Sequence, residues 1–119
     1  VETMATWCTN CRRQLRNVTE AKDLLADNED VVFVAISVET NISDEALFNY
    51  TEETGYFFTF AVATPEMVIS LADSFGQTIT NPPSTPHFII RPDGSTTDLV
   101  TGFEGPDDII ENLQAESQS

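Results

Sequence analysis

The continuous apolar run at residues 31–38, VVFVAISV, constrains the fold of this 119-residue chain more than any other feature. Runs of β-branched and aromatic residues without polar alternation are typical of a central strand that is covered on both faces. Patterns with helical spacing precede the run at residues 10–27 and follow it at residues 43–54. Because a strand between helices favours a parallel crossover, we expect an α/β protein.

The rest of the chain extends this alternation. The predicted elements are a strand at 1–5, helices at 10–27, 43–54 and 65–75, a strand at 31–38, a short strand or extended connection at 56–64, a loop at 77–86, a hairpin at 87–103 and a helix at 106–115. The Pro-Asp-Gly turn of the hairpin adds antiparallel strands. We therefore predict one domain over residues 1–119, with a central mixed β-sheet flanked by helices on both faces.

The charge of the chain is strongly negative. Twenty acidic residues stand against five basic ones, for a formal charge of -15. Nucleic acid is excluded as a partner on this basis, because phosphate contacts need basic side chains. Abundant Asp and Glu with almost no Lys resemble the proteins of salt-loving archaea, and solubility or a partner with a basic face are the alternatives.

The only two cysteines, Cys8 and Cys11, lie in the stretch MATWCTNCRR. Zinc sites use the same spacing, and a site built from both cysteines, His87 and a carboxylate is one alternative. A purely structural disulfide is another, although so small a loop restricts the unfolded chain least. Redox exchange is the leading interpretation.

The predicted position of the pair favours redox exchange. A strand gives way to a helix here, so Cys8 would lie at the helix N-terminus, where free N–H groups and the helix dipole favour a thiolate. Cys11 would lie one turn inside the helix, shielded and within bonding reach. We expect Cys8 to be an exposed nucleophile and Cys11 a protected resolving thiol.

Two motifs, ATWCTNC after a strand and STPHFIIRPDG much later, resemble those of the thioredoxin superfamily, and most closely those of the TlpA/ResA-like thiol–disulfide oxidoreductases. Those proteins carry an extra segment between the second strand and the later proline motif, which residues 41–64 can supply. The resemblance covers essentially the whole chain, and it implies a thioredoxin-like fold.

The resemblance also assigns site residues. Cys8 matches the nucleophile and Cys11 the resolving cysteine, while Trp7 matches the aromatic residue that flanks the site. Pro86 matches the cis-proline, and a cis bond would turn the backbone groups of Thr85 toward the disulfide, where they can pair with an incoming chain.

Glu2 lies six residues before Cys8, where thioredoxins carry a buried aspartate. A carboxyl group in that strand would have a raised pKa and could relay a proton to or from Cys11. The alternative is a charge at a frayed terminus. His87 is open to two interpretations as well, since it could tune the Cys8 thiolate or face solvent or a neighbouring polar group.

The implied function is disulfide exchange with protein disulfide or dithiol substrates, preferably as a reductase that an upstream thiol reductant resets. It needs no cofactor and no metal. A non-catalytic thioredoxin-like binding module is the rival. The dipeptide Thr9-Asn10 lacks the proline or glycine common in the family, so the redox potential stays open.

Localisation is the least determined property. The chain opens abruptly on VETMATWC, so we expect that the rest of the first strand, and any membrane anchor, precede this sequence. N-x-Ser/Thr sequons at Asn17, Asn41 and Asn49 hint at an extracytoplasmic location. The cell envelope is therefore preferred over the cytoplasm.

Overall fold

A computed structural model of the chain describes residues 1–25, 31–39, 42–56 and 58–116. In chain order the elements are β1 (Glu2–Met4), α1 (Thr9–Leu24), β2 (Val34–Ser37), α2 (Asp44–Thr54), β3 (Thr59–Val62), α3 (Pro65–Phe75), the 3₁₀ helices η1 (Gln77–Thr80) and η2 (Pro82–Ser84), and α4 (Pro106–Glu116). The sequon at Asn41 lies outside the described residues.

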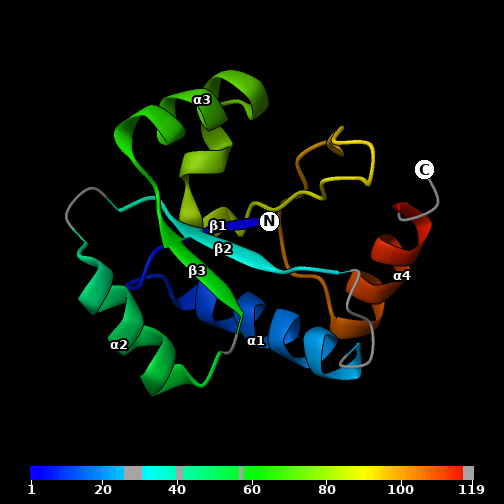
Figure 1. Cartoon of the computed structure of the whole chain (residues 1–119), viewed down its shortest axis with the longest axis horizontal. Helices are drawn as coiled ribbons and strands as arrows, with labels where there is room; N and C mark the ends of the chain where they lie inside the picture. The colour runs from blue at the N-terminus through cyan, green and yellow to red at the C-terminus, as the bar shows by residue number, and fades with distance from the viewer. Residues whose placement is uncertain (26–30, 40–41, 57, 117–119) are drawn as a thin grey trace.

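The three strands form a parallel sheet in the order β1-β2-β3. Glu2 is in register with Ala35, and Ala35 with Phe60, so the apolar run supplies the central strand as predicted. In Figure 1, α3 lies on one side of the sheet, while α1 and α4 lie on the other. Val18 and Ala21 of α1 pack against Ile109 of α4 to form one of the two core clusters.

Local signals in the sequence place the helix ends. The Ser43 hydroxyl accepts a hydrogen bond from the Ala46 N–H at 3.1 Å and caps α2. Gly55 ends α2 with φ 75°, a left-handed conformation that glycine adopts without the steric cost of a Cβ atom. Thr64 caps α3, and Pro65 occupies its first turn. These boundaries agree with the predictions.

The predicted hairpin is looser than two regular strands. His87 exchanges both backbone hydrogen bonds with Val100 at 2.9 Å, and Ile90 bridges Thr96, but these are isolated bridges. A further antiparallel bridge joins Glu2 to His87, so the segment extends the sheet beside β1. The sheet is therefore mixed only through these bridges. The predicted loop at 77–86 contains η1 and η2.

Candidate active site

The two cysteines form a disulfide at the N-terminus of α1. Cys8 is the N-cap residue, and its Sγ atom accepts a hydrogen bond from the Cys11 N–H at 3.0 Å. This is the placement that the sequence predicts, with Cys11 one turn inside the helix. A reduced Cys8 would keep this N–H donor, and a donor at a helix N-terminus stabilises a thiolate. Trp7, before Cys8, has 65% of its surface exposed.

Both sulfur-bearing side chains are buried, so the expectation of an exposed Cys8 is wrong. Cys8 is 2% exposed and Cys11 0% exposed. They belong to one apolar cluster with Met4 and Ala5, next to the motif, and with Leu47 and Tyr50, which are contributed by α2. This cluster joins residues far apart in the sequence and buries the pair, and the sequence around the cysteines carries no sign of it.

The chain reverses at Thr85, whose backbone is left-handed with φ 48° and ψ 54°. The prediction of a cis peptide bond between Thr85 and Pro86 is wrong. Among the described residues, which include both, the structure contains no cis peptide bond. The left-handed turn makes the reversal instead, and the Pro86 carbonyl accepts from the Thr3 N–H at 3.2 Å. The Thr85 N–H donates to the Pro82 carbonyl at 2.8 Å, and the Thr85 carbonyl lies 2.7 Å from the Nδ1 atom of His87. Both backbone groups of Thr85 therefore have partners within the chain.

The helix η2 lies directly against the Cys-x-x-Cys motif. The Cys11 Sγ atom is 3.2 Å from the Pro82 carbonyl oxygen, and the Asn10 side-chain amide donates to the Pro83 carbonyl at 3.0 Å. A reduced Cys11 thiol could donate to the same Pro82 oxygen. These contacts give Asn10 a role that the sequence left open.

Glu39 is a site residue that the sequence analysis missed. Its Oε1 atom accepts hydrogen bonds from the Thr6 N–H at 2.6 Å and from the Thr6 hydroxyl at 2.8 Å. The Ser37 hydroxyl lies 3.3 Å from the other carboxylate oxygen. Glu39 therefore fixes the turn that leads into Cys8. A signal was available, because Glu39 follows β2 at the sheet edge where β1 also ends, and sites in open parallel sheets gather at that edge.

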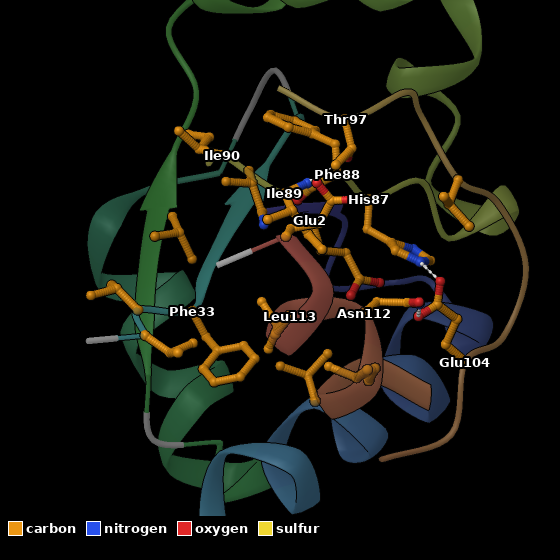
Figure 2. Close-up of a pocket in the computed structure, with 18 of the residues that line it drawn as sticks. Glu2, Phe33, His87, Phe88, Ile89, Ile90, Thr97, Glu104, Asn112 and Leu113 are labelled. Carbon is orange, nitrogen blue, oxygen red and sulfur yellow. Dashed lines mark hydrogen bonds and ion pairs between the residues drawn. The ribbon is translucent and has the colours of Figure 1, made fainter. Parts of the chain in front are cut away.

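Glu2 is buried in β1, and its side chain faces a cavity of about 920 Å³ (Figure 2). Neither carboxylate oxygen has a hydrogen-bond partner among the described residues. Burial raises the pKa of Glu2 well above the ordinary 4.5, the amino terminus opposes the shift, and the charge of Glu104 adds to it. The interpretation of Glu2 as a frayed surface charge is therefore wrong. The cysteines do not line this cavity.

His87 and Glu104 form an ion pair at the polar end of the same cavity. The Nε2 atom of His87 lies 3.0 Å from Glu104 Oε1, and the Asn112 amide donates to Glu104 Oε2 at 3.1 Å (Figure 2). The Gln14 side chain, on α1, accepts the Glu104 N–H at 3.0 Å. The His87 bond to Glu104 lowers the pKa of the Glu104 carboxyl, partly offset by burial. His87 thus faces neighbouring polar groups, which was one of the two expectations.

The ligands of the alternative zinc site, both cysteines, His87 and a carboxylate, do not come together in the part of the chain that the structure describes. Both ring nitrogens of His87 already have partners, and among the described residues no three His, Cys, Asp or Glu side chains come together in a group that could hold a metal ion. The sulfur atoms are joined to each other instead.

Two solved structures are similar to nearly the whole chain. One is a thiol:disulfide interchange protein of the thioredoxin family from Chlorobium tepidum TLS, with a TM-score of 0.74 and 22% identity, covering 98% of this chain and 77% of its own. The fold is thioredoxin-like. The other is a secreted Mycobacterium tuberculosis disulfide oxidoreductase, described as homologous to E. coli DsbE, with a TM-score of 0.63 and 19% identity, covering 96% of this chain and 78% of its own.

No protein-family model matches the sequence, and no curated protein matches it. The solved structures confirm the predicted fold class, and at these identities they show the fold alone. In this thioredoxin-like fold the disulfide lies where β1 passes into α1, beside η2 and the Thr85 turn.

Proposed function

We propose that the protein is a thiol–disulfide oxidoreductase that exchanges disulfides with protein substrates through Cys8 and Cys11, in a single thioredoxin-like domain over residues 1–119. One observation carries the proposal. The two cysteines are joined at a helix N-terminus, where the Cys8 sulfur accepts the Cys11 N–H. Both similar structures are described as disulfide-exchanging proteins, which supports the same chemistry here.

The preferred direction is reduction of the substrate. The Cys8 thiolate attacks one sulfur of a substrate disulfide, and the second substrate sulfur leaves as a thiolate and takes up a proton. Cys11 then loses its proton, and its thiolate attacks the Cys8 sulfur. The mixed disulfide breaks, and the substrate sulfur that was bound to Cys8 leaves as a thiolate and takes up a proton. The enzyme ends oxidised and the substrate reduced by two electrons. An upstream thiol reductant resets Cys8 and Cys11, and no cofactor takes part.

Glu2 is the proposed proton acceptor for Cys11. Its support is the buried carboxyl with no hydrogen-bond partner among the described residues and a pKa raised by burial, which favours a carboxyl group that takes up a proton. Glu2 lies on β1, whose last residue, Met4, packs in the cluster that holds the disulfide.

Trp7, Thr85 and Pro86 are the proposed substrate-binding residues. The exposed Trp7 ring offers apolar contact area beside Cys8. The Thr85 carbonyl already accepts from His87, and its second lone pair is the group that could accept from a substrate chain. Because Cys8 is buried, a substrate also has to displace part of the packing around it.

The TlpA/ResA-like subtype and an extracytoplasmic location belong to the proposal as well. The segment with α2 and β3 lies between β2 and the Pro86 turn, as that subtype requires. The Mycobacterium tuberculosis neighbour is described as secreted. Among the described residues, no helix combines the length and apolarity that crossing a bilayer needs. A halophilic source, suggested by the charge of -15, completes the proposal.

Burial of both cysteines favours one rival, a non-catalytic binding module. Reduction of a protein disulfide by dithiothreitol, with and without the protein, separates the two. We expect acceleration by the wild type and none by Cys8→Ser, because the attacking sulfur is gone. Acceleration that survives this substitution would overturn the mechanism.

The equilibrium potential against glutathione then decides the direction. A value near the roughly -270 mV of thioredoxin supports a reductase, and a value near about -120 mV supports an oxidase.

A further inference from the structure

A closed ring of contacts begins and ends on helix α1. Gln14 accepts the Glu104 N–H at 3.0 Å, and Glu104 pairs with His87 at 3.0 Å. His87 then contacts the Thr85 carbonyl at 2.7 Å. Figure 2 shows the His87–Glu104 part of this ring. The ring closes through Pro82, whose carbonyl accepts the Thr85 N–H at 2.8 Å and lies 3.2 Å from the Cys11 sulfur. It therefore connects the polar end of the cavity to the redox couple.

The two contacts of His87 fix the orientation of its ring. A carbonyl oxygen only accepts, so the contact with Thr85 is a hydrogen bond that the Nδ1 atom donates. The Nε2 atom, on the other side of the ring, lies 3.0 Å from a Glu104 carboxylate oxygen. Glu104 therefore holds the ring in the orientation that presents Nδ1 to Thr85.

The Thr85 conformation needs such support. A β-branched residue with positive φ is a rare and costly arrangement, which persists where surrounding contacts hold it. The two backbone bonds of Thr85, to Pro82 and to His87, are the contacts available for this. Loss of the His87 bond would release one of them, and with it the position of the Pro82 carbonyl against Cys11.

We propose that His87 and Glu104 form a positioning pair for the redox couple, which holds the Thr85 turn so that the Pro82 carbonyl stays within hydrogen-bond reach of the Cys11 sulfur. The inference rests on the proposed disulfide exchange and extends it, because it identifies which residues outside the Cys-x-x-Cys motif set the redox equilibrium. Neither residue touches a reacting sulfur.

The effect on the redox equilibrium has a definite sign. In the oxidised protein the Cys11 sulfur has no proton to donate. Reduction by two glutathione molecules breaks the Cys8–Cys11 bond, forms one glutathione disulfide and gives both cysteine sulfurs a proton at equilibrium below their pKa values. The Cys11 thiol can then donate to the Pro82 carbonyl, so the ring stabilises the reduced form. Weakening the ring should shift the equilibrium toward the protein disulfide.

The test measures the equilibrium constant of the full chain with glutathione. Free thiols are alkylated, and the reduced and oxidised fractions are quantified by mass spectrometry. We expect His87→Phe, which removes both ring contacts, to shift the constant at least threefold toward the disulfide, as expected for a single weak hydrogen bond. A tenfold shift would be about 30 mV. His87→Asn retains an N–H at the Nδ1 position, so it should stay within about twofold of the wild type.

Glu116→Gln is the matched control. Glu116 pairs with Arg91 at 2.6 Å and also ties the hairpin segment to α4, and among the described residues no hydrogen bond or ion pair joins it to the Thr85 turn. We expect no shift from this variant. The same shift in Glu116→Gln and His87→Phe would show a general loosening of the fold and overturn the proposal, as would an unshifted His87→Phe.

If near-ultraviolet circular dichroism shows that His87→Phe does not fold, the glutathione equilibrium of Glu104→Ala tests the proposal instead. It leaves His87 in place without its carboxylate, and it should shift the equilibrium in the same direction by a smaller factor. An unshifted Glu104→Ala would then contradict the proposal. Because glutathione equilibrium needs no protein substrate, a wild type that fails to reduce protein disulfides would count against the proposed function alone.

Discussion

The two ends of strand β1 have opposite surroundings. At its carboxyl end, Met4 and Ala5 are fully buried and pack with Cys8 and Cys11. At its amino end, Glu2 is equally buried, but its carboxyl faces a cavity of about 920 Å³ and has no partner among the described residues. Close packing fixes the redox couple in one geometry, whereas the cavity leaves a buried proton-binding group without a fixed bond.

The largest difference should appear in core truncations at the two ends. Met4→Ala removes a fully buried side chain from the packed end, and we expect it to lower the free energy of unfolding by about 2–5 kcal/mol. Ile109→Ala, on the α4 side of the existing cavity, should cost less, near the lower end of that range at about 2 kcal/mol, because fewer contacts are lost there. Urea denaturation measures both. Equal losses would show that the two ends are packed alike.

The next effect is the pH dependence that Glu2 imposes. Since its pKa in the folded protein is raised above the ordinary 4.5, the folded state binds more protons than the unfolded state between these two values. Stability should therefore fall as pH rises above 4.5, by up to about 1.4 kcal/mol per pH unit. Glu2→Gln should remove this loss and be more stable than the wild type at alkaline pH.

Thermal melts of Glu2→Gln and wild type across pH 4 to 9 give the measurement. Parallel profiles for the two proteins would mean that Glu2 is ionised freely in the folded state, and its proposed role as proton acceptor for Cys11 would lose its basis. Disulfide reduction by Glu2→Gln, compared at the same pH values, tests that role directly.

Glu104 should show the reverse sign in the same cavity. Its pKa is lowered below the ordinary 4.5, first by the bond to His87, so its contribution is present above pH 4.5 and is lost as pH falls through the lowered value. Glu104→Gln should be less stable than the wild type at neutral pH by less than about 1 kcal/mol, because partly exposed pairs contribute little. The two melts should converge in acid, and a constant difference would contradict the pairing.

The features that the sequence predicted correctly are those fixed by residues close together in the chain. The ends of α2 and α3 were predicted correctly because Ser43, Gly55 and Pro65 act within a few residues of their own position. The disulfide at the start of α1 was equally local. Each of these features depends on the chain immediately around it.

The misses are the non-local features. Burial of Cys8 in a cluster that includes residues of α2 depends on how the elements pack. The Glu39 bonds to Thr6, across 33 residues, depend on it as well. The His87–Glu104 pair joins residues 17 apart. The left-handed Thr85 runs against the preference of a β-branched residue, so nothing local indicates it, and a cis bond before Pro86 was expected instead.

The smallest effect is expected from Asn10, the residue inside the Cys-x-x-Cys motif whose role the sequence could not assign. Its side chain donates to the Pro83 carbonyl in an exposed bond, so Asn10→Ala should lower the free energy of unfolding by only about 0.5–1 kcal/mol. Thr9→Ala, at the other intervening position, is the control.

The Asn10 bond also holds η2 against α1, next to the Pro82 carbonyl that faces Cys11. If Asn10→Ala shifts the glutathione equilibrium toward the disulfide and Thr9→Ala does not, the Asn10 bond positions η2 together with the contacts of His87. Equal equilibrium constants for the two variants would mean that the His87 contacts alone position η2.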